Sequence, residues 1–265
     1  PKITMMVDSL LAAGLNIRIF TGGLIPEAVA VYLRALDPQR IRVVINVPVP
    51  GENLAEDKRG HLLRTMSVLS GFAALGFTIC DPEMDLRFLA DLAVRFDLRR
   101  TMRIGITAPR VDSMAKPPIG PADYRAVAQR ILELSAVCCG GGLTAELDCG
   151  FTRCMFTDEG MDLLAARKFR LVFTCSPVVD IGPDLSVWSC FPLMALGRVY
   201  LRDFSNRDEI VRHFGKQQRA YRNLGVYERC MSCEHKRCGA CAGGCLAHVI
   251  RSFAQDHANI PATTA

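Results

Sequence analysis

The 265-residue sequence lacks any apolar run long enough to cross a bilayer. Its longest hydrophobic stretches are interrupted by Arg, Asp or Gly well before the roughly 18 to 20 residues that a membrane-spanning helix needs. It also lacks a basic run, because its Lys and Arg residues are spread along the whole length at a formal net charge of +5; no stripe follows a phosphate backbone. The first residues form neither a basic nor an apolar leader segment. We therefore expect a cytoplasmic protein that binds neither membranes nor nucleic acid.

The chain has twelve cysteines, but its core is large enough that it does not need disulfide bonds for stability. Half of its residues are hydrophobic, so a chain of this length can bury the core of one α/β domain with a smaller appendage. Metal ligation is the better explanation for so many thiols. Seven of the cysteines follow residue 170, and five of those lie within residues 230–245.

The first half of the chain alternates short β-branched runs with longer amphipathic patterns, which predicts parallel strands alternating with helices. We expect helices over residues 3–13, 25–36, 61–75, 85–96 and 123–137, and strands over 17–20, 41–47, 77–80 and 102–107. The loops that follow these strands would lie at the rim where a βα barrel builds its active site. The glycines at 140–142 interrupt the pattern, so we place a domain boundary there. The expected domains are a partial βα barrel over 1–140, a cysteine-rich domain over 141–255 and a mobile tail over 256–265.

Two cysteine patterns occur in the second half. Cys175 and Cys190 flank two extended stretches that are joined by a Gly-Pro-Asp turn, and such a hairpin brings its ends together. The second pattern has gaps of two, four, two and three residues, with glycines that let backbone amides approach sulfur. Its members are Cys230, Cys233, Cys238, Cys241 and Cys245.

Soft thiolates select zinc, copper(I) or iron–sulfur clusters. A four-cysteine zinc knuckle made by residues 230–245 alone is one reading of the second pattern, since paired C-x2-C motifs also bind zinc. That reading leaves Cys175 and Cys190 unexplained. An iron–sulfur module could employ all of these cysteines.

The hairpin cysteines, followed about forty residues later by Cys230-x2-Cys233 and then Cys241-Ala-Gly-Gly-Cys245, resemble the SPASM domain of radical S-adenosylmethionine enzymes, or its shorter twitch variant. That domain binds one or two auxiliary [4Fe–4S] clusters. The resemblance implies that the first cluster is shared by Cys175, Cys190 and Cys245, and that the second is bound by Cys230, Cys233 and Cys241.

The sequence departs from the SPASM pattern in two ways. A full domain has one more cysteine downstream, but no cysteine follows Cys245, and the spacer from Cys233 to Cys241 is long, with Cys238 inside it as a candidate replacement ligand. Cys149 and Cys154 precede the hairpin and could supply a missing thiolate. The alternative is that these two are simply buried thiols, as we expect for the three remaining cysteines, at 80, 138 and 139.

The stretch AAGLNIRIFTGGL resembles the strand that follows the GGE motif of the same family, with Gly22 in place of Asn. The family's C-x3-C-x2-C loop, which binds the catalytic cluster and S-adenosylmethionine, is absent from this sequence, so no catalytic residue is assigned. Either the chain is N-terminally truncated before Pro1, or it is a degenerate relative that has lost radical chemistry. As given, it cannot cleave S-adenosylmethionine by the family mechanism.

The resemblance implies an α/β fold with a partial radical S-adenosylmethionine barrel and a small cysteine-rich domain. It also implies an activity of the full chain, in which a 5′-deoxyadenosyl radical modifies a substrate, often a peptide. Asn46, Glu52 and Arg110 lie on or beside the expected rim loops and could contact S-adenosylmethionine, although polar residues of a solvated loop are the commoner explanation. The competing class is a non-enzymatic metal-binding protein that holds zinc or a structural cluster.

Overall fold

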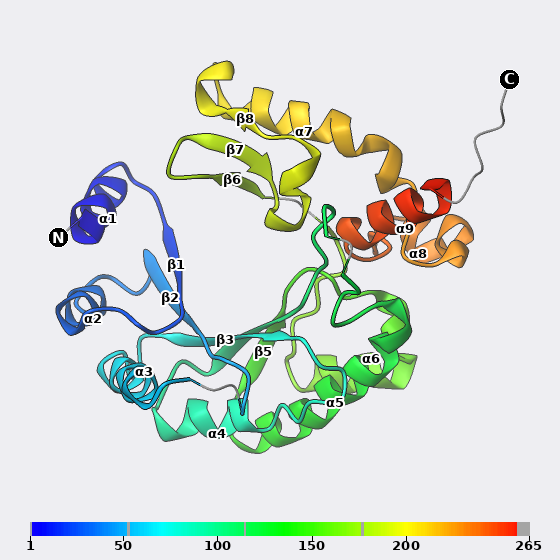
Figure 1. Ribbon diagram of the computed structural model, residues 1–265. Coiled ribbons are helices and arrows are strands. Elements are labelled where there is room, and N and C mark those ends of the chain that lie inside the picture. The colour runs from blue at the N-terminus through cyan, green and yellow to red at the C-terminus, as the bar shows by residue number, and fades with distance from the viewer. Residues whose placement is uncertain (1, 52–53, 114, 176–177, 259–265) are drawn as a thin grey trace, which may run out of the picture.

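The computed structural model describes residues 2–51, 54–113, 115–175 and 178–258, with the side chains of 254–258 left aside. Its first part is a curved, five-stranded parallel sheet with strand order β1-β2-β3-β4-β5. In Figure 1 the strands line the inside of an arc, and helices α2 to α6 lie along its outside. The elements follow one another as α1 (Lys2–Ala12), β1 (Ile17–Thr21), α2 (Glu27–Arg34), β2 (Ile41–Asn46), α3 (Glu56–Val68), β3 (Ala74–Ile79), α4 (Phe88–Arg95), β4 (Thr101–Ile106), η1 (Pro121–Asp123), α5 (Tyr124–Gly140), β5 (Thr144–Leu147), η2 (Arg153–Met155) and α6 (Asp158–Ala166).

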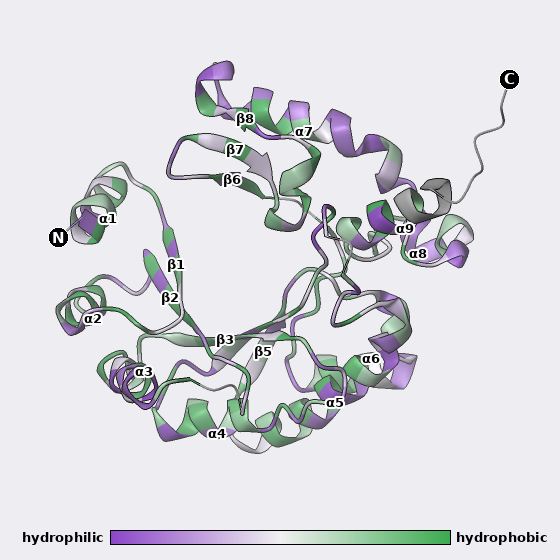
Figure 2. Ribbon diagram, viewed as in Figure 1, coloured by the Kyte–Doolittle hydropathy of each residue, from purple (hydrophilic) through white to green (hydrophobic). Residues whose placement is uncertain are grey.

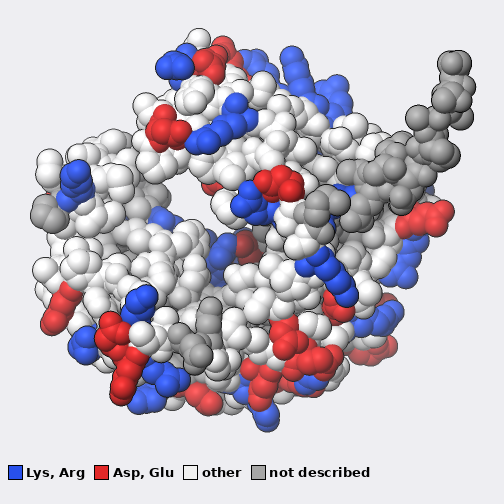
Figure 3. Space-filling model, viewed as in Figure 1, with Lys and Arg blue, Asp and Glu red and all other residues white. Residues whose placement is uncertain are grey.

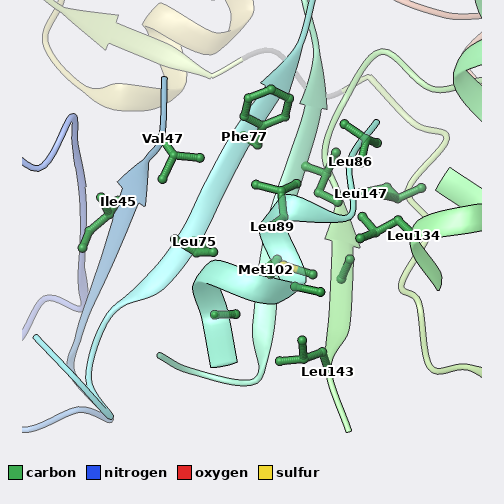
Figure 4. Close-up of a cluster of buried hydrophobic side chains, with 14 of the residues drawn as sticks. Ile45, Val47, Leu75, Phe77, Leu86, Leu89, Met102, Leu134, Leu143 and Leu147 are labelled. Carbon is green, nitrogen blue, oxygen red and sulfur yellow. The ribbon is translucent and has the colours of Figure 1, made fainter. Parts of the chain in front are cut away.

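The core lies between the outer face of this sheet and the helices. Alternate strand residues point to this side, among them Ile45, Leu75 and Phe77, and each is at most 2% exposed. In Figure 4, Leu75 of β3 lies near Leu89 of α4 and Met102 of β4, and Ile45 and Phe77 belong to the same buried cluster. Burial of these large side chains, each worth about 1.5–3 kcal/mol of transfer free energy, stabilises the sheet and helices as one unit.

The α/β class and most element positions agree with the sequence-based expectation, but the end of α3 and the start of β3 were placed wrongly. The helix expected over 61–75 ends at Val68, and Ala74 already begins β3. Residues 72–75 are an apolar run, whose periodicity does not separate a buried helix from a buried strand. Gly71, at a φ of +71°, separates the two elements.

The expected domain boundary at residues 140–142 falls inside the βα domain. β5 follows these glycines and pairs with β4 in parallel, Thr101 opposite Thr144, and α6 comes next. Arg170 then forms a further parallel bridge to Glu146. The glycines end α5, where Gly142 has a φ of +64°, so they form a helix-to-strand connection.

The second part of the chain is a small antiparallel sheet packed with helices, and its strand order is β6-β7-β8. The hairpin expected between Cys175 and Cys190 is present, with Val179 opposite Ser189. The tail expected from residue 256 begins within α9, and its residues from 259 onward lie outside the described residues. The elements are β6 (Val179–Ile181), β7 (Ser186–Ser189), η3 (Phe191–Leu196), β8 (Val199–Tyr200), η4 (Leu201–Asp203), α7 (Arg207–Arg222), η5 (Glu228–Ser232), α8 (Glu234–Arg237) and α9 (Leu246–Ala258).

Helix α7 lies over the small sheet with one apolar face. Figure 2 shows that the helix is largely hydrophilic. Its buried residues are Ile210, Phe214 and Gln218, and the first two form a cluster with Val187 of β7. The amide of Gln218 donates a hydrogen bond of 2.8 Å to the hydroxyl of Ser189, which fixes the helix on the hairpin beside Cys190. No helix in the described ranges is long and apolar enough to span a membrane.

Candidate metal centre

The two ends of the hairpin and the start of α9 meet on one apolar cluster. Cys175, Cys190 and Cys245 all pack against it, although they are up to 70 positions apart in the sequence. Cys190 has a left-handed backbone, at a φ of +64°, which is uncommon for a non-glycine residue and turns the chain out of β7 into η3. The cluster is formed by Leu193, Leu246, Ala247, Val249 and Ile250.

Cys149 joins these three cysteines from the loop after β5. The residue is exposed at the surface, yet its pKa is raised to about 12, chiefly by partial desolvation of the sulfur and further by the neighbouring Asp148, Cys245 and Cys175. Burial likewise raises the pKa of Cys190 to about 12, with Cys245, Cys149 and Cys175 as the next contributors. The four thiols therefore lie within electrostatic range of one another. We call Cys149, Cys175, Cys190 and Cys245 set A.

Cys245 lies directly before α9, so its sulfur meets backbone N–H groups of the first helical turn. Burial raises its pKa to about 11, and hydrogen bonds from the N–H groups of Ala247 and His248 act in the opposite direction. Such donors stabilise a thiolate at the N-terminal end of a helix. The position thus combines an apolar surrounding with hydrogen bonds that would serve a sulfur ligand.

A second group of thiols forms around Cys230, in η5. Burial raises the pKa of Cys230, and Cys154, Cys233 and Cys241 are the neighbouring thiols that raise it further. Cys154 comes from η2 of the βα domain, where its sulfur lies 3.5 Å from the hydroxyl of Thr152. We call Cys154, Cys230, Cys233 and Cys241 set B.

Glycines bring the backbone close to the sulfurs of set B. The N–H of Gly243 donates to the sulfur of Cys241 at 3.3 Å, and Gly243 has a φ of +81°. A Cβ on Gly225 would lie 2.7 Å from the sulfur of Cys230, closer than any real Cβ contact. Backbone amides that donate to sulfur and a closely packed main chain are features that tune iron–sulfur clusters.

The remaining four cysteines belong to neither set, although Cys238 lies next to Cys241 of set B, whose N–H donates to the same carbonyl oxygen of His235. Cys238 is exposed, and its thiol faces the carbonyl oxygen of His235 at 3.5 Å, so it points into its own helical turn. Cys138 is fully buried in the core of the βα domain, where burial raises its pKa to about 11. Cys139 is exposed at the end of α5, and Cys80 is partly buried after β3.

The two sets differ in arrangement from a site for one ion. In the described part of the chain, no three His, Cys, Asp or Glu side chains are gathered closely enough to hold a single metal ion. Four thiolates on one zinc ion, each about 2.3 Å from it, would lie about 3.8 Å from one another. Thiolates on a four-iron cluster bind separate irons and lie further apart.

The residues expected to contact S-adenosylmethionine stand at different strand ends. Asn46 is exposed at the last position of β2. Its side-chain oxygen lies over Gly76 of β3, so a Cβ at position 76 would collide with that oxygen. Arg110 is held by Asp112, with a nitrogen–oxygen distance of 2.6 Å, and its presence lowers the pKa of that carboxyl. Glu52 lies outside the described residues.

Two features of the site were not found from the sequence. One is the division of Cys149 and Cys154 between the two sets. The other is the contact of Tyr227, just before η5, whose hydroxyl donates a 2.5 Å hydrogen bond to the carbonyl oxygen of Pro121 and so ties the cysteine-rich segment to the βα domain. Gly225, five positions earlier, is a further sequence signal for the close approach near Cys230.

Comparison with known proteins found no matching family model, no matching curated protein and no matching solved structure.

Proposed function

We propose that this chain is the cluster-binding portion of a radical S-adenosylmethionine enzyme and that it holds two auxiliary [4Fe–4S] clusters, one on set A and one on set B. The observation that carries the proposal is the convergence of Cys149, Cys175, Cys190 and Cys245 from three distant segments. In the complete enzyme the substrate would be a peptide or a small molecule.

The composition of each set supports this assignment. Each has four thiols, the usual ligand number of a [4Fe–4S] cluster. One thiol of each set comes from the βα domain, Cys149 in set A and Cys154 in set B. Apolar side chains such as Leu246 and Val249 pack beside set A and would keep water away from a bound cluster.

The zinc-knuckle alternative fits this geometry less well. A knuckle made by residues 230–245 alone would draw its ligands from within that segment. The thiol of Cys245, however, has Cys175 as its neighbouring thiol, and Cys230 has Cys154 from the βα domain beside it in addition to Cys233 and Cys241. Both sets therefore mix cysteines from distant parts of the chain.

A bound cluster would supply electron transfer or a binding site for substrate. The residues of this chain would have three tasks. The eight thiols would bind iron, the N–H groups of Gly243 and of Ala247 would donate to sulfur, and the cluster of Leu193 and Leu246 would exclude water. Hydrogen bonds and burial are the means by which a protein sets a cluster's reduction potential.

Anaerobic reconstitution with iron and sulfide tests the proposal. Two four-iron clusters require about eight irons per chain and give broad absorption near about 400 nm. Cys190→Ser removes a ligand of set A and Cys230→Ser a ligand of set B, so each variant should hold about four irons. Cys139→Ser is the matched control, because Cys139 is an exposed cysteine outside both sets.

The proposal fails if the purified protein is colourless and contains zinc. It also fails if Cys190→Ser and Cys139→Ser hold equal amounts of iron. A loss that is confined to Cys230→Ser would support a single cluster on set B and reject set A.

A further inference from the structure

The inner face of the parallel sheet carries a surplus of arginine. Arg18 of β1 and Arg42 of β2 are register partners in neighbouring parallel strands, so their side chains leave the same face next to each other. Both side chains are exposed, and neither has an ion-pair or hydrogen-bond partner among the described residues. Like charges on facing positions of a sheet are destabilising. Their pairing is unfavourable unless something negative lies between them.

A third arginine, Arg99, approaches the same place from the turn before β4. It lines a cavity of about 240 Å³ together with Arg18, Arg42, Arg103 and Glu146. One terminal nitrogen of its guanidinium, Nη1, is buried and has no hydrogen-bond partner. A buried donor without a partner costs free energy, so nearly all such groups are satisfied in folded proteins.

The carboxylates of this face do not neutralise the arginines. Asp148 is engaged with Arg103, and Glu146 lies 3.7 Å from Arg170. A second cavity of about 330 Å³ shares Arg18, Arg103 and Glu146 with the first and extends toward Arg170. Two carboxylates therefore face five arginines, and Arg18, Arg42 and Arg99 remain without a negative partner. Figure 3 shows a hollow through the middle of the molecule, with Lys or Arg atoms on its wall.

We infer that the inner face of the sheet at Arg18, Arg42 and Arg99 binds an oxyanion, namely the phosphate or carboxylate group of a small molecule. A guanidinium offers a planar fork of N–H donors that matches two oxygens of such a group. An oxyanion would relieve the repulsion between Arg18 and Arg42, and Arg99, which lines the same cavity, would add a third positive charge beside it. These residues lie in the first half of their strands or just before them, at the end of the sheet away from the rim loops.

Arg42 and Arg99 line the first cavity, whereas Arg18 also lines the second one together with Cys149 of set A. The titration is therefore made both with the iron-free chain and with the anaerobically reconstituted protein. Inorganic phosphate and, separately, succinate are titrated into the protein by calorimetry at constant ionic strength, so that the two oxyanion chemistries are distinguished. We expect one of the probes to bind saturably at one site per chain.

The Arg18→Gln/Arg42→Gln variant should weaken that binding at least tenfold, and Arg99→Gln should weaken it too. Arg64→Gln/Arg125→Gln is the control, since it removes the same charge from exposed positions on helices α3 and α5, and it should leave the dissociation constant within twofold. Circular dichroism verifies the fold of each variant. The inference is overturned if neither probe saturates, or if the control weakens binding as much as the Arg18→Gln/Arg42→Gln variant.

Discussion

The close packing of Gly225 against Cys230 gives a sharp test of set B. A methyl group at Gly225 would collide with the Cβ of Cys230 and lie 2.7 Å from its sulfur and 3.4 Å from the carbonyl oxygen of Gly243. Because favourable contacts need about 3.5–4.0 Å, the main chain at Gly225 or at Cys230 must move by more than about 1 Å. That same carbonyl of Gly243 accepts a 2.9 Å hydrogen bond from the N–H of Val226, so a shift of the main chain strains this bond as well.

For Gly225→Ala we expect a net loss of roughly 1–2 kcal/mol. Overpacking costs about 1–3 kcal/mol, and the reduced freedom of the unfolded chain returns only about 0.4–1 kcal/mol. Since the displaced atom is the proposed ligand sulfur, iron content should also fall from about eight to about four per chain. Urea denaturation followed by circular dichroism measures the first quantity, and iron analysis of anaerobically reconstituted protein measures the second.

Gly215→Ala is the matched control for this substitution. Gly215 lies inside α7, and a Cβ there meets nothing within 4 Å. Replacing a helical glycine with alanine should raise the unfolding free energy by about 0.5–1 kcal/mol and leave iron unchanged. If Gly225→Ala behaved like Gly215→Ala in both measurements, the close contact and the role of Cys230 would both be refuted.

Two further predictions concern the fold and the junction of its two parts. Leu75→Ala should lower the free energy of unfolding in urea by about 2–5 kcal/mol, because Leu75 is 1% exposed in the core. The control Val31→Ala, on the outside of α2 at 55% exposure, should change that free energy by less than about 0.5 kcal/mol. Equal effects would contradict the core assignment. Tyr227→Phe keeps the ring but deletes the hydrogen bond to η1, so the free energy of unfolding should fall by about 1 kcal/mol. An unchanged value would mean that this bond contributes nothing to joining the two parts.

The fold was predictable from local patterns where those patterns were unambiguous. β-branched runs place β1, β2 and β4 within one residue of the observed strands at most ends, and the hairpin follows from the turn between Cys175 and Cys190. The errors arose where one signal has two meanings. The apolar run at 72–75 suits either a helix or a strand, and the glycines at 140–142 end a helix rather than a domain.

The candidate site was predictable only in part. Spacing suggested that residues of the hairpin and of 230–245 converge, and the structure packs Cys175, Cys190 and Cys245 on one apolar cluster. The sequence did not show which set Cys149 and Cys154 would each join, because a separation of five residues does not reveal how the loop between them turns. Phe151, 1% exposed, anchors the loop in the core between these two cysteines, and this tertiary contact decides which set each one joins.

The dependence of both sets on the loop after β5 affects how the protein would be made in the cell. Under the proposed assignment, Cys149 leaves the ribosome about 100 residues before Cys245, an interval of roughly 5–20 s at a synthesis rate of about 5–20 residues per second. During this interval each set still lacks at least one ligand, because set B is completed only at Cys241 and set A only at Cys245. Iron would therefore be inserted late, after the residues of both parts have been made.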